Sequence, residues 1–219
     1  MLLALLLMTG ACDSPKPAPP VKPATQEPAG SDPASPPPSP TTSSADDPEV
    51  VGPAPADLHD VDWATVRFPG DFCGVPGLVR FDAELEARAI SRTWGHVRIG
   101  VGSKVIYGDS NGDNRDEAAV YVGCDDDGLT QNSQIMAGYV IFGHAGKNLA
   151  VIGSITPQKE PLDNYATALV RAEFALGRII VHEKWYRSSD AHCCPTGNAT
   201  TVWTREGNRL TPGAPRITS

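Results

Sequence analysis

Proline is concentrated in one stretch of this chain, and that stretch limits the fold to what the remaining residues can build. Residues 13–56 contain 14 of the 21 prolines and no aromatic residue. A segment of this composition buries too little apolar surface to offset the entropy of ordering it. We therefore predict a disordered, extended spacer over 13–56, followed by one folded domain over 57–219.

The first twelve residues have the composition of an export signal. An apolar run, 2–8, is followed by Thr9, Gly10, Ala11 and then Cys12. The run is too short to cross a bilayer as a helix. The segment resembles a bacterial lipoprotein signal peptide, which implies that 1–12 is the signal and that Cys12 carries the lipid. A plain secretory signal with a chance cysteine is the alternative.

Short apolar runs separated by turn residues recur through 57–219, and a long helical period is missing from the sequence. Runs at 135–142 and 149–155 flank a turn, and runs at 168–176 and 178–185 flank Gly177. The residues 101–103 suggest a tight hairpin between two further runs. This pattern predicts a mainly β fold, a single disulfide-linked antiparallel domain built as a sandwich, a barrel or a propeller fragment.

An acidic loop, 109–117, precedes the apolar strand predicted at 118–122. Oxygen donors alternate at its start, and such an arrangement can wrap around a hard cation such as calcium. We predict one structural calcium ion, with Asp116 pointing outward or accepting a hydrogen bond behind the ligands. The expected ligands are the side chains of Asp109, Asn111, Asp113 and Glu117 and the carbonyl of Arg115.

The loop does not match an EF-hand, because Asn114 and Val120 stand where that motif needs Gly and Glu. It resembles the shorter D-x-N-G-D-G-x-x-[DE] loops of FG-GAP-type β proteins, with Asn114 in place of the second Gly. Asn tolerates the left-handed conformation required there. The alternative is a solvated turn, in which Asp and Asn simply favour the local backbone conformation.

Four cysteines lie in the domain, and an exported protein is expected to oxidise them to disulfides. A bond between the adjacent Cys193 and Cys194 is discounted, because it would force a strained geometry. Two pairings remain open: Cys73–Cys193 with Cys124–Cys194, or the reverse. A zinc site would have to use these last two cysteines with His182 and His192, and their spacing does not match the usual zinc pairs.

The chain carries a net charge of −8, which argues against nucleic-acid binding. The signal with its proline spacer, the acidic loop before a strand ending in Cys124, and the late Cys193-Cys194-Pro195-Thr196 resemble small exported lipoproteins of high-GC Gram-positive bacteria. The resemblance implies a lipid-anchored protein on the extracellular face of the cell membrane.

Two classes of function remain open on the sequence. The first is a non-enzymatic binding or structural module for a cell-envelope protein or glycan. The alternative is an exported hydrolase of cell-wall glycan or peptide, in which Glu183 or His182 would face the carboxylates of 125–127. The four tryptophans could form a sugar platform, but core positions are the expected place for them.

Overall fold

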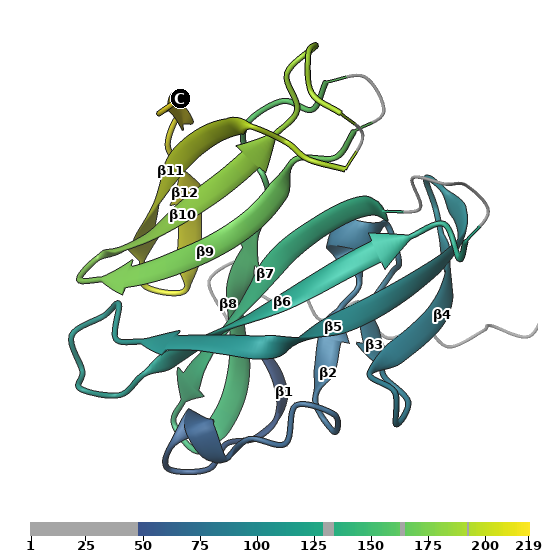
Figure 1. Ribbon diagram of the computed structural model, residues 1–219. Coiled ribbons are helices and arrows are strands. Elements are labelled where there is room, and N and C mark those ends of the chain that lie inside the picture. Colours follow the sequence, from purple (N-terminus) through teal and green to yellow (C-terminus); the bar gives the residue numbers. More distant parts are fainter. Residues whose placement is uncertain (1–47, 129–133, 163–164, 192) are drawn as a thin grey trace, which may run out of the picture. The chain divides into compact units, whose positions relative to one another are not determined.

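A computed structural model describes residues 48–128, 134–162, 165–191 and 193–219. These residues form two β-sheets and a short ribbon (Figure 1), which confirms the predicted mainly β, antiparallel fold. The predicted signal, 1–12, and most of the predicted spacer lie outside them. Among the described residues, no helix has the length and apolarity that crossing a membrane requires.

The larger sheet has six strands within the described residues. Their order across the sheet is β1 (Glu49–Pro53), β8 (Asn148–Ile155), β7 (Gln134–Ala145), β6 (Glu117–Asp125), β5 (Gly95–Gly108) and β4 (Glu86–Ser91). All neighbours in this sheet are antiparallel.

The smaller sheet has five strands in the same described ranges. Its order is β12 (Arg209–Pro212), β11 (Gly197–Glu206), β10 (Arg178–Trp185) and β9 (Ala168–Ala175), and β13 (Arg216–Ile217) pairs with β11. The predicted turn at Gly177 joins β9 to β10, and a second tight turn, at Gly207, joins β11 to β12.

Strand β6 is buried on both faces, as expected for a strand whose sequence is almost continuously apolar. Alternate residues face two different cores. Ala118, Val120, Val122 and Cys124 face the first core, and Ala119 faces the second. The six-stranded sheet is therefore the middle layer of the domain.

The first core is closed by the segment before β4. This segment contains the 3-10 turns η1 (Leu58–Asp60) and η2 (Asp71–Cys73) and the ribbon of β2 (Arg67–Pro69) and β3 (Leu78–Arg80). Phe68 is fully buried here and lies edge-to-face against Phe142 of β7, with ring centroids 5.0 Å apart.

The second core lies between the two sheets. Tyr139 and Ile141 of the larger sheet meet Ile179, Val181 and Trp203 of the smaller one. This face-to-face packing selects the sandwich among the three predicted architectures. Trp203 is 5% exposed and is a core residue, as expected, whereas Trp94 is 38% exposed and is not.

The folded domain begins earlier than predicted. The predicted spacer includes residues 49–56, but Glu49–Pro53 forms β1 and pairs with β8. Proline is tolerated here because β1 is an edge strand and Pro53 ends it. The predicted hairpin at 101–103 is also wrong. Those residues belong to the long strand β5, which continues along β6 through a bulge between Val101 and Val105.

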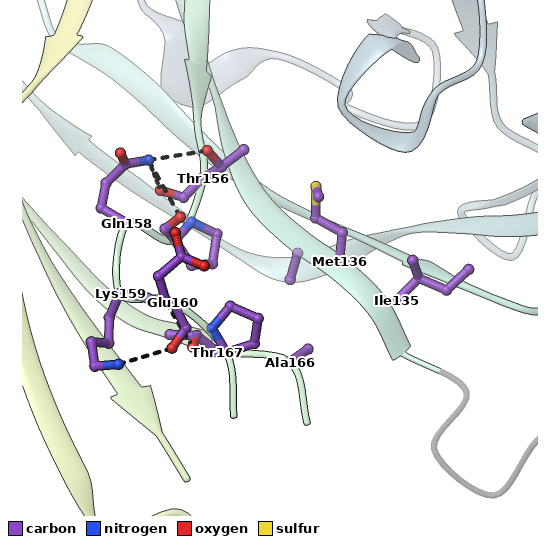
Figure 2. Close-up of a pocket in the computed structure, with 11 residues that line it drawn as sticks. Ile135, Met136, Thr156, Gln158, Lys159, Glu160, Ala166 and Thr167 are labelled. Atoms are coloured by element: carbon purple, nitrogen blue, oxygen red, sulfur yellow. Dashed lines mark hydrogen bonds between the residues drawn. The ribbon is translucent and has the colours of Figure 1, made fainter. Parts of the chain in front are cut away.

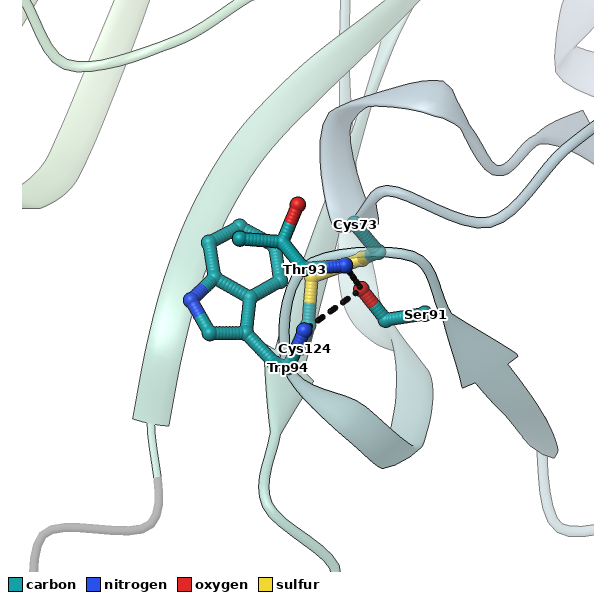
Figure 3. Close-up of a disulfide and its surroundings, with 5 residues drawn as sticks. All are labelled: Cys73, Ser91, Thr93, Trp94 and Cys124. Atoms are coloured by element: carbon teal, nitrogen blue, oxygen red, sulfur yellow. Dashed lines mark hydrogen bonds between the residues drawn. A yellow bond between two sulfur atoms is a disulfide. The ribbon is translucent and has the colours of Figure 1, made fainter.

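All four domain cysteines form disulfides, but the predicted partners are wrong. The structure joins Cys73 to Cys124 (Figure 3), and Cys193 to Cys194, the bond that the sequence argument discounted. The reason is that successive residues of a strand face opposite sides of the sheet. Cys124 faces the first core, toward η2, whereas the smaller sheet that leads to Cys193 packs on the other face of β6.

The buried disulfide fastens η2 to β6 next to the β4–β5 turn. Cys73 and Cys124 are 0% and 1% exposed. Beside them, the Ser91 hydroxyl accepts hydrogen bonds from the backbone N–H groups of Thr93 (3.1 Å) and Trp94 (3.2 Å), as Figure 3 shows. The Arg92 N–H donates to the Gly74 carbonyl at 2.8 Å, which ties this turn to the end of η2.

We expect non-reducing peptide mapping to recover Cys73 linked to Cys124, and Cys193 linked to Cys194. The double variant Cys73→Ala/Cys124→Ala is expected to lose about 4 kcal/mol of unfolding free energy, because the bond spans 51 residues. The matched variant Cys193→Ala/Cys194→Ala is expected to lose much less, because its bond closes no long loop. A peptide linking Cys124 to Cys193 or Cys194 would contradict this arrangement.

Candidate functional site

The acidic loop between β5 and β6 is held by its own side chains. The Asp109 carboxylate accepts hydrogen bonds from the backbone N–H groups of Asn111 (3.1 Å), Gly112 (2.6 Å) and Asn114 (2.9 Å). These bonds, that from Gly112 above all, lower the pKa of Asp109 below its ordinary value. Asn114 has a φ of 62°, the left-handed conformation expected at this position.

The next donors continue the same pattern. Asn111 Oδ1 accepts the Asp113 N–H at 2.9 Å, and Asp113 Oδ1 accepts the Arg115 N–H at 2.9 Å. Asn111 Nδ2 also donates to Asp113 Oδ2 at 3.1 Å. Asp109, Asn111 and Asp113 thus belong to one exposed turn network, which is the local behaviour that Asp and Asn favour.

Glu117 does not join that network. Its Oε2 accepts both the backbone N–H and the hydroxyl of Ser110, each at 2.7 Å. Its Oε1 lies 2.6 Å from Arg205 Nη1, and both side chains are more than nine-tenths buried. The sequence places Glu117 among the oxygen donors of the loop, whereas the structure directs its carboxylate to an arginine on β11.

Asp116 has a different partner again. Its Oδ2 lies 3.2 Å from His59 Nε2, and the His59 ring stacks on Tyr107 with centroids 3.8 Å apart. In the described part of the chain, no three His, Cys, Asp or Glu residues are grouped so as to hold a metal ion. Calcium binding by the side chains of Asp109, Asn111 and Asp113 and by the Arg115 carbonyl stays a prediction.

The Glu117–Arg205 pair joins the two sheets. Arg205 Nη1 also donates to the Ser110 hydroxyl at 2.7 Å, and the Ser110 carbonyl accepts the Gly177 N–H at 2.7 Å. The Gly177 carbonyl in turn accepts the Arg205 N–H at 2.9 Å. The end of the β9–β10 hairpin is therefore fixed to the start of the acidic loop. Sequence reasoning missed Ser110 and Arg205, because they are 95 residues apart.

A second buried carboxylate, Glu183 on β10, holds a loop by the same means. It accepts the backbone N–H groups of Gln158 (3.1 Å) and Lys159 (2.8 Å) and the hydroxyl of Thr201 (2.6 Å). Glu183 is 1% exposed. All three donors are internal to the fold, so this carboxylate positions the loop between β8 and β9.

That loop forms one wall of a pocket (Figure 2). The opposite wall is the start of β7, and the pocket has a volume of about 180 Å³. The lining residues are Ile135–Ala137, Thr156–Pro161, Ala166 and Thr167. Thr167 Oγ1 donates to the Lys159 carbonyl at 3.0 Å, so Thr167 and Glu183 both hold this loop in place. The pocket is mostly apolar, with a few polar groups, which is the usual character of ligand sites.

The residues considered for a hydrolase, Glu183, His182 and Asp125, each contact different partners. Glu183 faces the sheet interior, and its neighbour His182 faces outward and contacts Glu173 Oε1 at 3.1 Å. Asp125 pairs with Arg98, at 2.8 Å between Oδ2 and Nη2. Each group has its own partner within the described residues, so the structure does not bring the hydrolase candidates together in one site.

The exposed Cys193–Cys194 disulfide lies in the loop between β10 and β11. Asp190 holds this loop by accepting the N–H groups of Arg187 and Thr196 (2.8 Å each) and the Thr196 hydroxyl (2.7 Å). These bonds, first that from Arg187, lower the pKa of Asp190. These sulfurs bond each other and so are not free to bind zinc, and His192 lies outside the described residues.

No protein-family model, curated protein or solved structure matches this chain.

The Glu117–Arg205 pair is expected to be strongly coupled. Glu117→Ala and Arg205→Ala should each cost about 3–5 kcal/mol of unfolding free energy, because each leaves a buried charge unpaired. The double variant should lose less than the sum, by about 1–3 kcal/mol, in chemical denaturation. The exposed pair Arg88–Asp127 is the control, with an expected coupling below about 1 kcal/mol. Strictly additive losses at Glu117 and Arg205 would contradict the pairing.

Calcium at the acidic loop is expected to raise the melting temperature by mass action. The comparison is millimolar calcium against chelator, on the wild type and on Asp113→Ala, which removes one predicted ligand. A rise in the wild type alone supports the loop site. An unchanged wild-type melt rejects it, and an equal rise in both proteins places the ion elsewhere.

Proposed function

We propose that this protein is a lipid-anchored module on the extracellular side of the cell membrane and that it binds a component of the cell envelope without catalysing a reaction. The observation that carries the binding role is the pocket between β7 and the β8–β9 loop. Its wall is fixed from behind by the buried Glu183, so the recess is formed before a ligand arrives. Such preorganisation reduces the ordering cost of binding.

The titratable groups of this pocket support binding rather than catalysis. Lys159 and Glu160 line it, and Lys159 Nζ donates to the Glu160 carbonyl at 3.0 Å and lies 4.5 Å from the Trp185 ring centroid. The Lys159 ammonium is therefore held by a backbone oxygen and an aromatic face. The buried carboxylates, Glu117 and Glu183, are likewise engaged with internal donors.

Three features support an exported, anchored protein. The apolar run 2–8 leads to Cys12, the proline-rich spacer follows, and both domain disulfides fit an oxidising compartment. A chain held by lipid at Cys12 would present the domain at the end of that spacer. A calcium ion at the acidic loop would add stability to the start of β6 without taking part in binding.

Cell fractionation tests the anchor. We expect the wild type in the membrane fraction and Cys12→Ser in the medium, because the serine cannot accept the thioether-linked lipid. A Cys12→Ser protein that remains in the membrane fraction at the wild-type level would contradict lipidation at Cys12.

Retention on isolated cell envelope tests the binding role, using the full-length Cys12→Ser protein. Ala166 lines the pocket, so Ala166→Phe in this background is expected to weaken retention about tenfold. Ala145→Phe is the matched control, because Ala145 is also half-buried but lies at the opposite end of β7. Equal retention of both variants and the parent would contradict binding at the pocket.

A further inference from the structure

The smaller sheet covers only part of the six-stranded sheet, and a second hollow lies on the same face beside it. Figure 1 shows β9–β12 over one part of the larger sheet, with β4 beyond them. The hollow runs across β4, β5 and β6 and has a volume of about 340 Å³. Small-ligand sites occupy roughly 300–1,000 Å³. Its main lining residues are Glu86, Arg98, Gly100, Tyr121, Gly123 and Asp125.

Two glycines form the floor of this hollow. Gly100 of β5 and Gly123 of β6 lie directly opposite each other in regular register, between the pairs Ile99–Cys124 and Val101–Val122. Glycine in the interior of a strand weakens it, so a pair of glycines facing each other calls for an explanation.

Neither a positive φ nor close packing requires these glycines. Neither is among the residues with positive φ. A Cβ at Gly100 would meet no atom of the described chain within 4 Å, and one at Gly123 would come no closer than 3.9 Å to any. By contrast, a Cβ at Gly138 would lie 2.7 Å from the Ile155 carbonyl oxygen, and one at Gly143 would lie 2.6 Å from Ile152. Close approach of a ligand is one of the reasons for glycine in a strand, and the open space above both positions fits it.

The walls of the hollow are an aromatic ring and a planar ion pair. The Tyr121 ring packs on Gly102 and meets Tyr139 edge-on with the ring centroids 5.6 Å apart, and burial raises the pKa of Tyr121. Across the glycines, Arg98 donates to Asp125 Oδ2 from Nε (3.0 Å) and from Nη2 (2.8 Å). Arg98 Nη1 also lies 3.5 Å from Glu86 Oε1.

These groups indicate the chemistry of the ligand. The single arginine is flanked by two carboxylates, so the lining has no spare positive charge for a phosphate or a carboxylate ligand. An extended peptide would need free backbone groups, whereas Gly100 and Gly123 lie inside the hydrogen-bonded ladder. A planar Arg–Asp pair offers donors and acceptors side by side, which suits neighbouring hydroxyl groups. An open glycine floor beside Tyr121 suits the apolar face of a flat ring.

We infer that this glycine-floored groove (Glu86, Arg98, Gly100, Tyr121, Gly123 and Asp125) binds a neutral oligosaccharide. The inference rests on the proposed function and extends it, because the groove adjoins the pocket on the same sheet. Ala137, which lines the pocket, is the cross-strand partner of Gly123. One glycan chain would then contact both hollows.

The test uses the full-length Cys12→Ser protein and isothermal titration with chitohexaose, cellohexaose and maltohexaose, and with an anionic galacturonate hexamer for comparison. We expect at least one neutral hexasaccharide to bind more tightly than the anionic one. Gly100→Val and Gly123→Val should each weaken that binding at least about tenfold, because the new side chain occupies the floor.

The melting temperature distinguishes a blocked groove from a damaged fold. Both variants should melt at the wild-type temperature or about 2–4 °C above it, because a β-branched residue replaces glycine in a strand where space is open. Gly52→Val is the matched control. Gly52 also lies in a strand, and its Cβ would meet no described atom within 4 Å, but β1 is at the opposite edge of the sheet. It should bind like the parent.

Each contrary outcome has a separate meaning. If none of the neutral hexasaccharides binds while the envelope still retains the protein, the inference that the ligand is a neutral oligosaccharide is wrong and the proposed function stands. If Gly100→Val and Gly123→Val bind like the parent, the groove is not the site. If both variants unfold, the fold itself needs these glycines and the inference fails. If Ala166→Phe loses envelope retention but Gly100→Val and Gly123→Val keep it, the pocket is a binding site and the groove is not.

Discussion

The burial of one carboxylate, that of Glu117, decides how the two sheets meet. A charged group at the start of a strand covered on both faces is very costly unless an opposite charge and further donors accompany it into the interior. Ser110 supplies two donors from the preceding loop, and Arg205 supplies the charge from β11. The position of β11, and with it that of the smaller sheet, is therefore coupled to the loop that precedes β6. The side chain of Glu117 therefore restrains a strand that is distant from it in the sequence.

Glu183, on the other sheet, is a second buried carboxylate that is held by donors from within the protein. Here two backbone N–H groups and a hydroxyl donate to the carboxylate, and none of the described residues forms an ion pair with it. The donors come from a loop, so what the carboxylate fixes is the shape of the surface above it. Both buried acids act as anchors for irregular backbone, and the surfaces available for binding lie beside the loops that they hold.

The local features of the fold could be predicted from the sequence. The strand at 118–122 and the hairpins around Gly177 and 206–208 follow from apolar runs and turn residues that lie close together in the chain. The long-range features could not. The edge strand at Glu49–Pro53 depends on an unpaired side of β8, and the cysteine partners depend on which face of β6 each element covers. The sequence likewise draws attention to 109–117 as a set of acids, but it carries no signal that Glu117 pairs with Arg205.

The glycine-floored groove illustrates a different limit. Gly100 and Gly123 look like ordinary turn or bulge residues in the sequence, and Gly102 does lie in the bulge of β5. Only the register shows that two of these glycines face each other in a regular part of the sheet. Their meaning comes from what surrounds them, which a single sequence does not contain.

The disulfide arrangement also bears on how the chain matures. Among the four domain cysteines, each bond joins residues that are consecutive in the sequence, Cys73 with Cys124 and Cys193 with Cys194. A chain that emerges with its N-terminus first exposes Cys73 and Cys124 together before Cys193 has appeared. Among the domain cysteines, the native bonds are thus the first ones available to an oxidant, and their formation requires no later exchange of partners.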